Sequence, residues 1–150
     1  MPDLYFEDFQ AGQVVELGTH TVSEEEIVAF ARQWDPQPFH VDTEAARGSV
    51  FGGLIASGWH TGAMWMRLYV DSLLGSGSGQ GSSGIEELRW LAPVRPGDTL
   101  SGRLIVLETT SSERHPDRGT IRLRGEMVNQ DGVTVMSMVS RGRFARRSPQ

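Results

Sequence analysis

The spacing of hydrophobic and polar positions changes along the chain, and each change predicts a different element. Over residues 13–22 the two kinds of position alternate loosely, which is typical of a β-strand. Over residues 24–34 the apolar positions return every three or four residues, which predicts an amphipathic helix. Ser23 and Glu26 have the capping-box spacing that begins such a helix. We expect the helix to end at Asp35, because a proline follows it.

Residues 58–74 form a longer helical pattern in which apolar residues occur on most sides. A helix of this kind is buried on most sides. The rest of the chain alternates in strand-like segments between glycine, proline and polar turns, over residues 85–91, 99–110, 120–130 and 133–144. Residues 1–150 are therefore expected to form one α+β domain, in which a curved antiparallel sheet wraps a long buried helix.

Two segments fall outside these elements. Residues 75–84 consist almost entirely of glycine and serine, which predicts a flexible loop without a fixed partner. Residues 145–150 include Arg146 and Arg147 and are expected to form a solvated C-terminal tail.

The composition excludes several kinds of chemistry. The chain has 150 residues with no cysteine, and all 14 of its basic residues are arginine. Disulfides, thiolate nucleophiles, cysteine-bound zinc and lysine Schiff bases are thereby excluded. The net charge of −5 disfavours nucleic-acid binding, and no apolar run is long enough to span a bilayer. The N-terminus has no signal-peptide pattern, so a cytoplasmic location is expected.

The candidate chemistry lies between Asp35 and Gly58. Asp35 and His40 stand five positions apart, and the prolines between them restrict the backbone enough to hold both side chains in a fixed arrangement. Gly58 begins the second helix, whose N-terminus presents free N–H groups. A base, an acid and an oxyanion donor can therefore converge here. His40, Asp42 and His60 have no compact metal-ligand spacing, so no metal is expected.

Each of these residues also has a structural interpretation. By spacing alone, Asp35 is a turn residue that ends a helix, and His40 is a histidine satisfied by the backbone. Asp42 is expected to cap a short helical turn over residues 43–47. Ser57 either positions a substrate or caps the helix that begins at Gly58.

The two segments together resemble the hydratase motif of MaoC-like dehydratases and (R)-specific enoyl-CoA hydratases. Residues 35–42 read Asp-Pro-Gln-Pro-Phe-His-Val-Asp, and residues 51–58 read Phe-Gly-Gly-Leu-Ile-Ala-Ser-Gly. The sequence departs from that motif at Gln37, where the family has Asn, and at Ser57, where His is common. Residues 5–12 and 91–98 are also similar, so the resemblance covers nearly the whole chain.

The resemblance implies a hotdog fold and a lyase that adds water reversibly to a 2-enoyl-CoA to give a 3-hydroxyacyl-CoA. The family's catalytic aspartate and histidine map onto Asp35 and His40, and its oxyanion glycine maps onto Gly58. Gln37 stands where the motif has Asn, and its side chain is one methylene longer. It is expected to orient the catalytic loop from a shifted position.

The substrate site is expected to include Ser57, Gln37 and Phe51 as well. The family implies an acyl-CoA as substrate and no separate cofactor. The arginines that cluster near the C-terminus are, as the alternative to a solvated tail, candidate contacts for CoA phosphates: Arg141, Arg143, Arg146 and Arg147. It also implies a homodimer, which would cover the long edge strand of the sheet.

Two other functions remain open from the sequence. A hotdog thioesterase would cleave an acyl-CoA, although thioesterases lack the Asp-x-x-Pro-x-His pairing. A non-catalytic acyl-CoA-binding subunit would keep only the fold, and the departures at Gln37 and Ser57 leave room for it. The sequence also leaves open the acyl chain length and which of Asp35 and His40 delivers the second proton.

Overall fold

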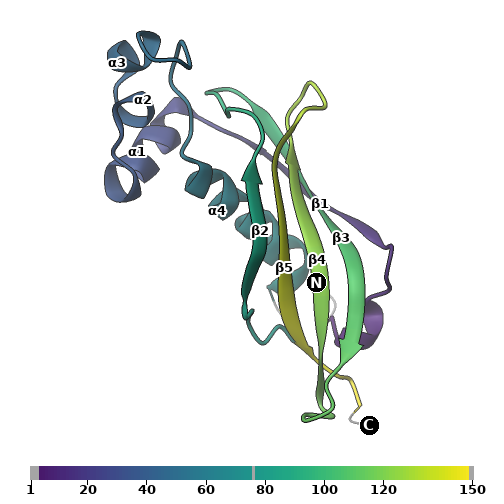
Figure 1. Ribbon diagram of the computed structural model, residues 1–150. Helices are drawn as coiled ribbons and strands as arrows, with labels where there is room; N and C mark the ends of the chain where they lie inside the picture. The colour runs from purple at the N-terminus through teal and green to yellow at the C-terminus, as the bar shows by residue number, and fades with distance from the viewer. Residues whose placement is uncertain (1–3, 76, 149–150) are drawn as a thin grey trace.

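A single antiparallel sheet organises the molecule in the computed structural model, which describes residues 4–75 and 77–148 (Figure 1). Its five strands lie in the order β1-β3-β4-β5-β2. Their bounds are Val14–Thr21 (β1), Gly84–Trp90 (β2), Thr99–Ser111 (β3), Arg118–Val128 (β4) and Thr134–Ala145 (β5). Every pairing is antiparallel, so the predicted α+β class with a curved antiparallel sheet is confirmed.

The helices divide into one that packs on the sheet and three that lie beyond its end (Figure 1). Their bounds are Glu24–Trp34 (α1), Pro38–Val41 (α2), Thr43–Arg47 (α3) and Gly58–Tyr69 (α4), and a 3-10 turn spans Phe6–Asp8 (η1). The predicted caps are present: Ser23 and Glu26 form a capping box on α1, and the Asp42 carboxylate accepts from two amides of α3. These caps fix where the short helices begin.

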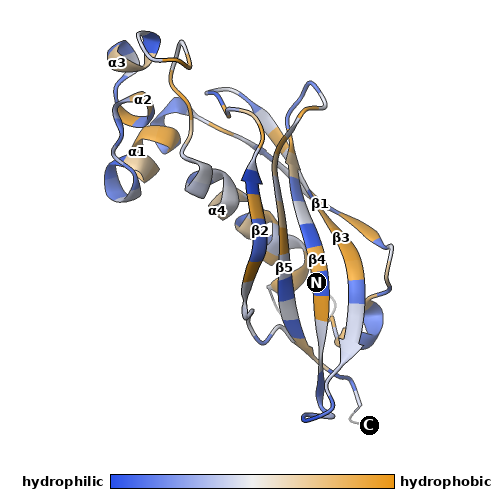
Figure 2. Ribbon diagram, viewed as in Figure 1, coloured by the Kyte–Doolittle hydropathy of each residue, from blue (hydrophilic) through white to orange (hydrophobic). Residues whose placement is uncertain are grey.

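The core lies between α4 and the inner face of the sheet. Figure 2 shows hydrophilic and hydrophobic residues alternating along β4, as expected for a strand with one buried face. Trp65 of α4 is fully buried and donates its indole N–H to the carbonyl of Arg103 at 3.1 Å. The ring fits because Gly125 faces it, and a Cβ at that position would overlap the indole.

The predicted helix over residues 58–74 has two parts. α4 ends at Tyr69, and the chain continues as a π-helical segment, Val70–Leu74 (η2). The amide of Gly75 donates to the carbonyl of Val70 at 2.7 Å, five residues back, which is the π-helical pattern. Periodicity gave no sign of this change because both parts keep apolar residues toward the sheet.

The expectation of an unpaired loop at residues 75–84 is wrong for the described residues 77–81. Gly79 forms a β-bridge with Phe144, the Gln80 amide donates to the carbonyl of Arg143, and the Arg143 amide donates to the carbonyl of Gly81. The segment therefore follows β5. Its glycines permit this, because a Cβ at Gly79 would lie only 3.3 Å from Leu74.

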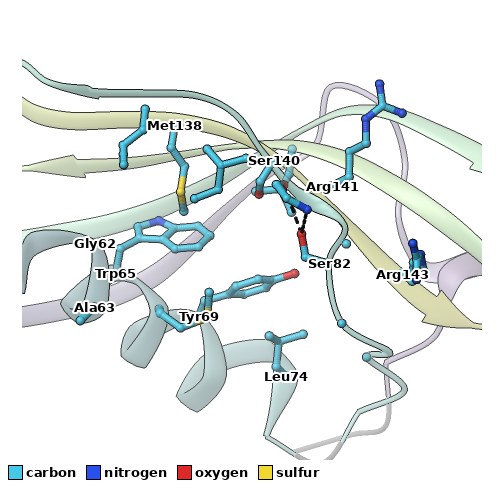
Figure 3. A pocket seen from close by; sticks show the side chains of 18 of the residues that line it. Gly62, Ala63, Trp65, Tyr69, Leu74, Ser82, Met138, Ser140, Arg141 and Arg143 are labelled. Carbon is cyan, nitrogen blue, oxygen red and sulfur yellow. Dashed lines mark hydrogen bonds between the residues drawn. The ribbon is translucent and has the colours of Figure 1, made fainter. Parts of the chain in front are cut away.

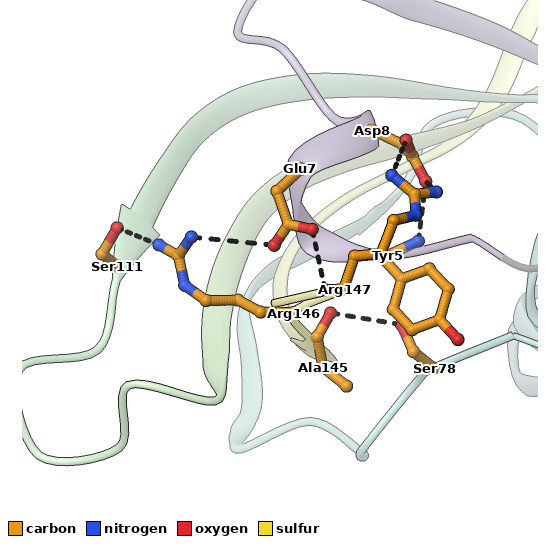
Figure 4. A network of polar contacts seen from close by, with 8 residues as sticks. All are labelled: Tyr5, Glu7, Asp8, Ser78, Ser111, Ala145, Arg146 and Arg147. Atoms are coloured by element: carbon orange, nitrogen blue, oxygen red, sulfur yellow. Dashed lines mark hydrogen bonds and ion pairs between the residues drawn. The ribbon is translucent and has the colours of Figure 1, made fainter. Parts of the chain in front are cut away.

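The expected solvated tail is also corrected for its described residues, 145–148. Figure 4 shows Arg146 and Arg147 reaching back to the N-terminal turn η1. Arg147 forms two bonds to the Asp8 carboxylate, at 3.1 and 2.9 Å. The Arg146 guanidinium lies over the Phe6 ring, 4.6 Å from its centroid, and its side chain is only 6% exposed. Charge and aromatic pairing hold the two ends of the chain together; residues 149 and 150 lie outside the described part.

Candidate active site

Three segments bring the predicted site residues together at the N-terminal end of α4. Asp35 is the C-cap of α1, and its amide donates to the carbonyl of Ala31 at 2.8 Å. Pro38 starts α2, which carries His40. Ser57 is the residue before α4. The prolines thus end one helix and begin the next within a few residues, which brings the side chains of Asp35 and His40 together.

The Asp35 carboxylate accepts from two side chains and faces a third. Ser57 donates its hydroxyl to Oδ2 at 2.7 Å, and Gln37 donates its amide to Oδ1 at 2.8 Å. Nε2 of His40 lies 3.3 Å from Oδ2. Burial raises the pKa of Asp35, but the bonds from Ser57 and Gln37 and the charge of His40 outweigh it, so the pKa lies below its ordinary value. Asp35 is therefore ionised at neutral pH.

His40 is buried, and the backbone fixes its orientation. Nδ1 lies 2.7 Å from the carbonyl oxygen of Ile55, which can only accept, so Nδ1 carries a proton. In the neutral imidazole the lone pair is then on Nε2, on the side of Asp35. The amide of Ile55 donates to the carbonyl of Phe39, which ties the two segments together.

Gly58 is the first residue of α4, and Ser57 makes no side-chain cap bond to the helix. The Ser57 hydroxyl is used on Asp35 instead, so of the two interpretations of Ser57 the helix cap is not found. The N–H of Gly58 lies at the positive end of the helix dipole, where it suits a developing negative charge. Glycine is required sterically, because a Cβ here would overlap the indole of Trp90.

A pocket of about 440 Å³ opens over these groups. Of the six predicted site residues, five line it: Asp35, Gln37, His40, Phe51 and Gly58. Ser57 is fully buried behind Asp35, so it acts on the carboxylate and not directly on the pocket. The Asp35 carboxylate, the His40 imidazole and the Gly58 amide thus face one pocket.

Sequence reasoning missed two contributors to this pocket. The carbonyl of Ile55 orients His40, and a backbone atom leaves no signal in the sequence. Trp90 ends β2 and packs against Gly58 and Trp59, with the two indole centroids 5.1 Å apart. Its position 32 residues from Gly58 gave no local pattern.

Residues 4–75 and 77–148 contain no group of three His, Asp or Glu side chains that could hold a metal ion. The described helices include none long and apolar enough to cross a membrane. What the site offers is a base at Nε2 of His40, beside an ionised carboxylate and an amide that can stabilise an oxyanion.

Comparison with known sequences agrees with this arrangement. Residues 8–125 match the model of the MaoC like domain. The (R)-specific enoyl-CoA hydratase of Rhodospirillum rubrum is 32% identical over 136 residues, which cover 88% of this chain and 90% of that protein. The 3-hydroxybutyryl-CoA dehydratase of Methylorubrum extorquens is 29% identical over 136 residues, covering 90% of this chain and 84% of the relative.

Solved structures show the same fold. The MaoC-like dehydratase from Rhodospirillum rubrum superposes with a TM-score of 0.89 at 43% identity, and the match covers 97% of this chain and 99% of the other. The expected hotdog fold is thereby confirmed.

Proposed function

This chain belongs to the MaoC-like domain family, and on that premise we propose that it adds water reversibly to a 2-enoyl-CoA to give a 3-hydroxyacyl-CoA. The observation that carries the proposal is the Asp35–His40 pair, 3.3 Å apart, facing one pocket with the first amide of α4. Two relatives, named as an enoyl-CoA hydratase and a hydroxybutyryl-CoA dehydratase, support the same chemistry. The CoA thioester is the substrate, and the reaction needs no separate cofactor.

Hydration begins with a water molecule in the pocket that contacts both Asp35 and His40. Nδ1 of His40 is committed to Ile55, so Nε2 is the free base, while Asp35 is a weakened base because two donors already bind it. As the water oxygen bonds to C3 of the substrate, its proton passes to Nε2. The π electrons of the C2–C3 bond move toward the thioester oxygen.

The remaining steps use Gly58 and the same pair. The N–H of Gly58 stabilises the negative charge on the thioester oxygen, and loss of one such donor typically costs about 3–4 kcal/mol of barrier. The imidazolium then returns a proton to C2, so that H and OH have added and His40 is neutral again. The ionised Asp35 carboxylate stabilises the imidazolium while it exists.

An assay with crotonyl-CoA and longer 2-enoyl-CoAs tests this function. Loss of the conjugated enoyl absorbance is followed for the wild type, Asp35→Asn and the control Asp42→Asn, with a thiol reagent in parallel. Asp42 caps α3, and Asn caps nearly as well, so the control should keep its activity. Asp35→Asn removes the charge that stabilises the imidazolium and should lower kcat/KM by about 10²–10³.

Other results would assign a different function. Release of free thiol would identify a thioesterase. No consumption of any 2-enoyl-CoA by the folded wild type would contradict the lyase and favour an acyl-binding subunit.

We also propose that the active form is a homodimer joined through β2, the edge strand that follows α4. Apolar side chains on and beside this edge are unusually exposed, among them Trp59 (60%), Ile85 (53%) and Leu91 (55%). A second copy pairing along β2 would cover them and satisfy the edge amides. Light scattering should give twice the monomer mass for the wild type, and Ile85→Glu should shift it toward the monomer. A monomeric wild type would contradict this proposal.

A further inference from the structure

The side chain of Thr61 lines the catalytic pocket but takes no part in the proton transfers at His40. Thr61 is only 2% exposed, so its polar group is buried beside the reacting groups. It lies three residues after Gly58 on α4, and the two residues therefore share one face of that helix. Helical side chains tilt toward the N-terminus of their helix, which directs the Thr61 side chain toward the end of α4 where Gly58 lies.

The Thr61 hydroxyl opens on this pocket and has no hydrogen-bond partner in residues 4–75 and 77–148. A helical threonine usually bonds the carbonyl four residues back, but the Ser57 carbonyl already accepts from the amides of His60 and Thr61, at 2.9 and 3.1 Å. In the same described residues, Nδ1 of His60 is the one enclosed side-chain nitrogen or oxygen without a partner. The Thr61 oxygen is therefore not enclosed, and the pocket that Thr61 lines is the space it reaches.

A second pocket, a groove of about 580 Å³ along α4, lies beside the catalytic pocket (Figure 3). Gly58 and Trp59 line both pockets, whereas Thr61 lines the catalytic pocket and not the groove. The groove is lined instead by Trp65 and Tyr69, whose rings point from the helix toward the sheet in Figure 3. The Thr61 hydroxyl thus belongs to the space where the reaction takes place.

The surroundings of Thr61 favour a strong hydrogen bond to a ligand. A hydrogen bond is electrostatically stronger in apolar surroundings than in water. Three buried apolar residues line the same pocket as Thr61: Ala56, Val94 and Val135.

The elements that carry the polar groups divide their roles. Asp35 and His40, which contact the attacking water in the proposed reaction, come from the end of α1 and from α2. Gly58 and Thr61 both come from the first turn of α4. Because the Gly58 amide is the donor to the thioester oxygen, the hydroxyl beside it on the same helix face is placed for that oxygen too.

We propose that the Thr61 hydroxyl is a catalytic hydrogen-bond donor, which binds the thioester oxygen of the substrate together with the Gly58 amide. The proposal rests on the proposed hydratase function and adds a second donor to its oxyanion site. A carbonyl oxygen has two lone pairs, so it can accept from both donors at once, and both bonds strengthen as negative charge develops on it. The hydroxyl keeps its proton throughout, so the proton transfers at His40 are unchanged.

Kinetics of Thr61→Val and Thr61→Ser test the proposal, with Thr109→Val as the matched control. For crotonyl-CoA, Thr61→Val should lower kcat about 10²-fold and change KM less than about twofold, because this bond is strongest in the transition state. Thr61→Ser keeps the hydroxyl, so its kcat should stay within about fivefold of the wild type. Thr109 is exposed on β3 and does not line the pocket, so its variant should change neither constant.

The absorbance of a bound ligand gives a readout that a purely structural role would not move. The probe is 2,4-hexadienoyl-CoA bound to Asp35→Asn, which slows turnover. Hydrogen bonds to the thioester oxygen should shift the conjugated absorbance of the probe to longer wavelength. Adding Thr61→Val should remove about half of that shift, since one of two donors is lost, and adding Thr109→Val should leave it unchanged. Urea unfolding should give Thr61→Val the stability of the wild type, because no protein group loses a partner.

The results separate this inference from the hydratase function. A kcat for Thr61→Val within about twofold of the wild type, or an absorbance shift that does not depend on residue 61, would overturn the inference while hydration by the wild type stands. Equal impairment of Thr61→Ser and Thr61→Val would also overturn it, because the hydroxyl would not be the group that matters. If the wild type hydrates no 2-enoyl-CoA but the shift still depends on Thr61, the proposed function fails and the oxyanion donor is supported.

Discussion

The Ser57 hydroxyl donates a 2.7 Å hydrogen bond to Oδ2 of Asp35, the same oxygen that lies 3.3 Å from Nε2 of His40. Ser57 is fully buried, so water does not compete for this bond. The serine thus helps to keep the carboxylate ionised beside the imidazole, and it acts on the reaction through Asp35.

The first prediction concerns the acidic limb of the pH–rate profile. Ser57→Ala removes one donor from the ionised carboxylate, so the pKa of Asp35 should rise toward its ordinary value. The Asp35–His40 pair then binds its proton more tightly, and the acidic limb of kcat/KM should move to higher pH by about one unit. Ser112→Ala, which removes a hydroxyl that accepts from the amide of His115 in the turn between β3 and β4, should leave the profile in place. An unmoved limb in Ser57→Ala would show that this bond does not tune the pair.

The second prediction compares two glycines of α4. A Cβ at Gly58 overlaps Trp90, so Gly58→Ala should lower the free energy of unfolding by about 1–3 kcal/mol. Gly62 has room for a methyl group, so Gly62→Ala should raise it by roughly 0.5–1 kcal/mol through helix propensity. Urea unfolding measures the free energy of unfolding of both variants. In a Trp90→Leu background the cost of Gly58→Ala should shrink, and a cost that does not depend on residue 90 would refute the steric explanation.

The third prediction concerns His60, which stacks on Phe30 with ring centroids 4.7 Å apart. Its Nδ1 is the one buried side-chain nitrogen or oxygen without a hydrogen-bond partner in the described part of the chain. An unsatisfied buried polar atom is costly, so His60→Leu should raise the free energy of unfolding by about 1 kcal/mol at pH 8. The exposed His115 gives the control, His115→Leu, which should have little effect.

The difference in the free energy of unfolding between His60→Leu and the wild type should depend on pH, and the pKa of His60 gives the direction. Burial lowers the pKa of His60, although the charge of Glu26 opposes the shift. The unfolded chain therefore binds this proton more readily, and the wild type loses stability as the pH falls through about 6.5, where an unperturbed histidine titrates. The advantage of His60→Leu over the wild type should thus be larger at pH 5 than at pH 8. A constant difference would mean that His60 is as easily protonated in the folded protein.

The fourth prediction concerns the contact between the two ends of the chain. The Arg146 side chain is 6% exposed, lies over Phe6 and is 3.6 Å from the Glu7 carboxylate. Arg146→Ala should lower the free energy of unfolding by about 1–2 kcal/mol, through lost packing as well as lost charge. Arg143→Ala, at an exposed position of the same strand region, should be nearly neutral. Arg146→Lys should fall between the two, because it keeps the charge and loses the planar stacking.

The features that could be predicted from the sequence are those that depend on residues close together in the chain. The capping box at Ser23 and Glu26, the end of α1 at Asp35 and the cap of α3 at Asp42 were all predictable, because each depends on residues within a few positions of one another. Strands β3 and β4 were predictable from alternation, since each has one buried face. The meeting of Asp35 and His40 followed from their motif, which places both on one short, proline-restricted segment.

The errors have the opposite origin. The segment at residues 75–84 has the composition of a free linker, and only the presence of β5 beside it supplies the partners that its backbone bonds. The role of Ser57 depends on Asp35, 22 residues away, and could not be told from a helix cap until both segments were in place.

The sequence by itself determined the helices, the strands and the identities of the groups that can transfer a proton. Those properties arise from short-range sterics, capping and periodicity. The tertiary structure decided which of those groups share a space, how the Ile55 carbonyl fixes the imidazole, and where the groove along α4 joins the site at Gly58. These relationships depend on side chains and backbone atoms far apart in the chain, and they exist only once α4 has packed against the sheet.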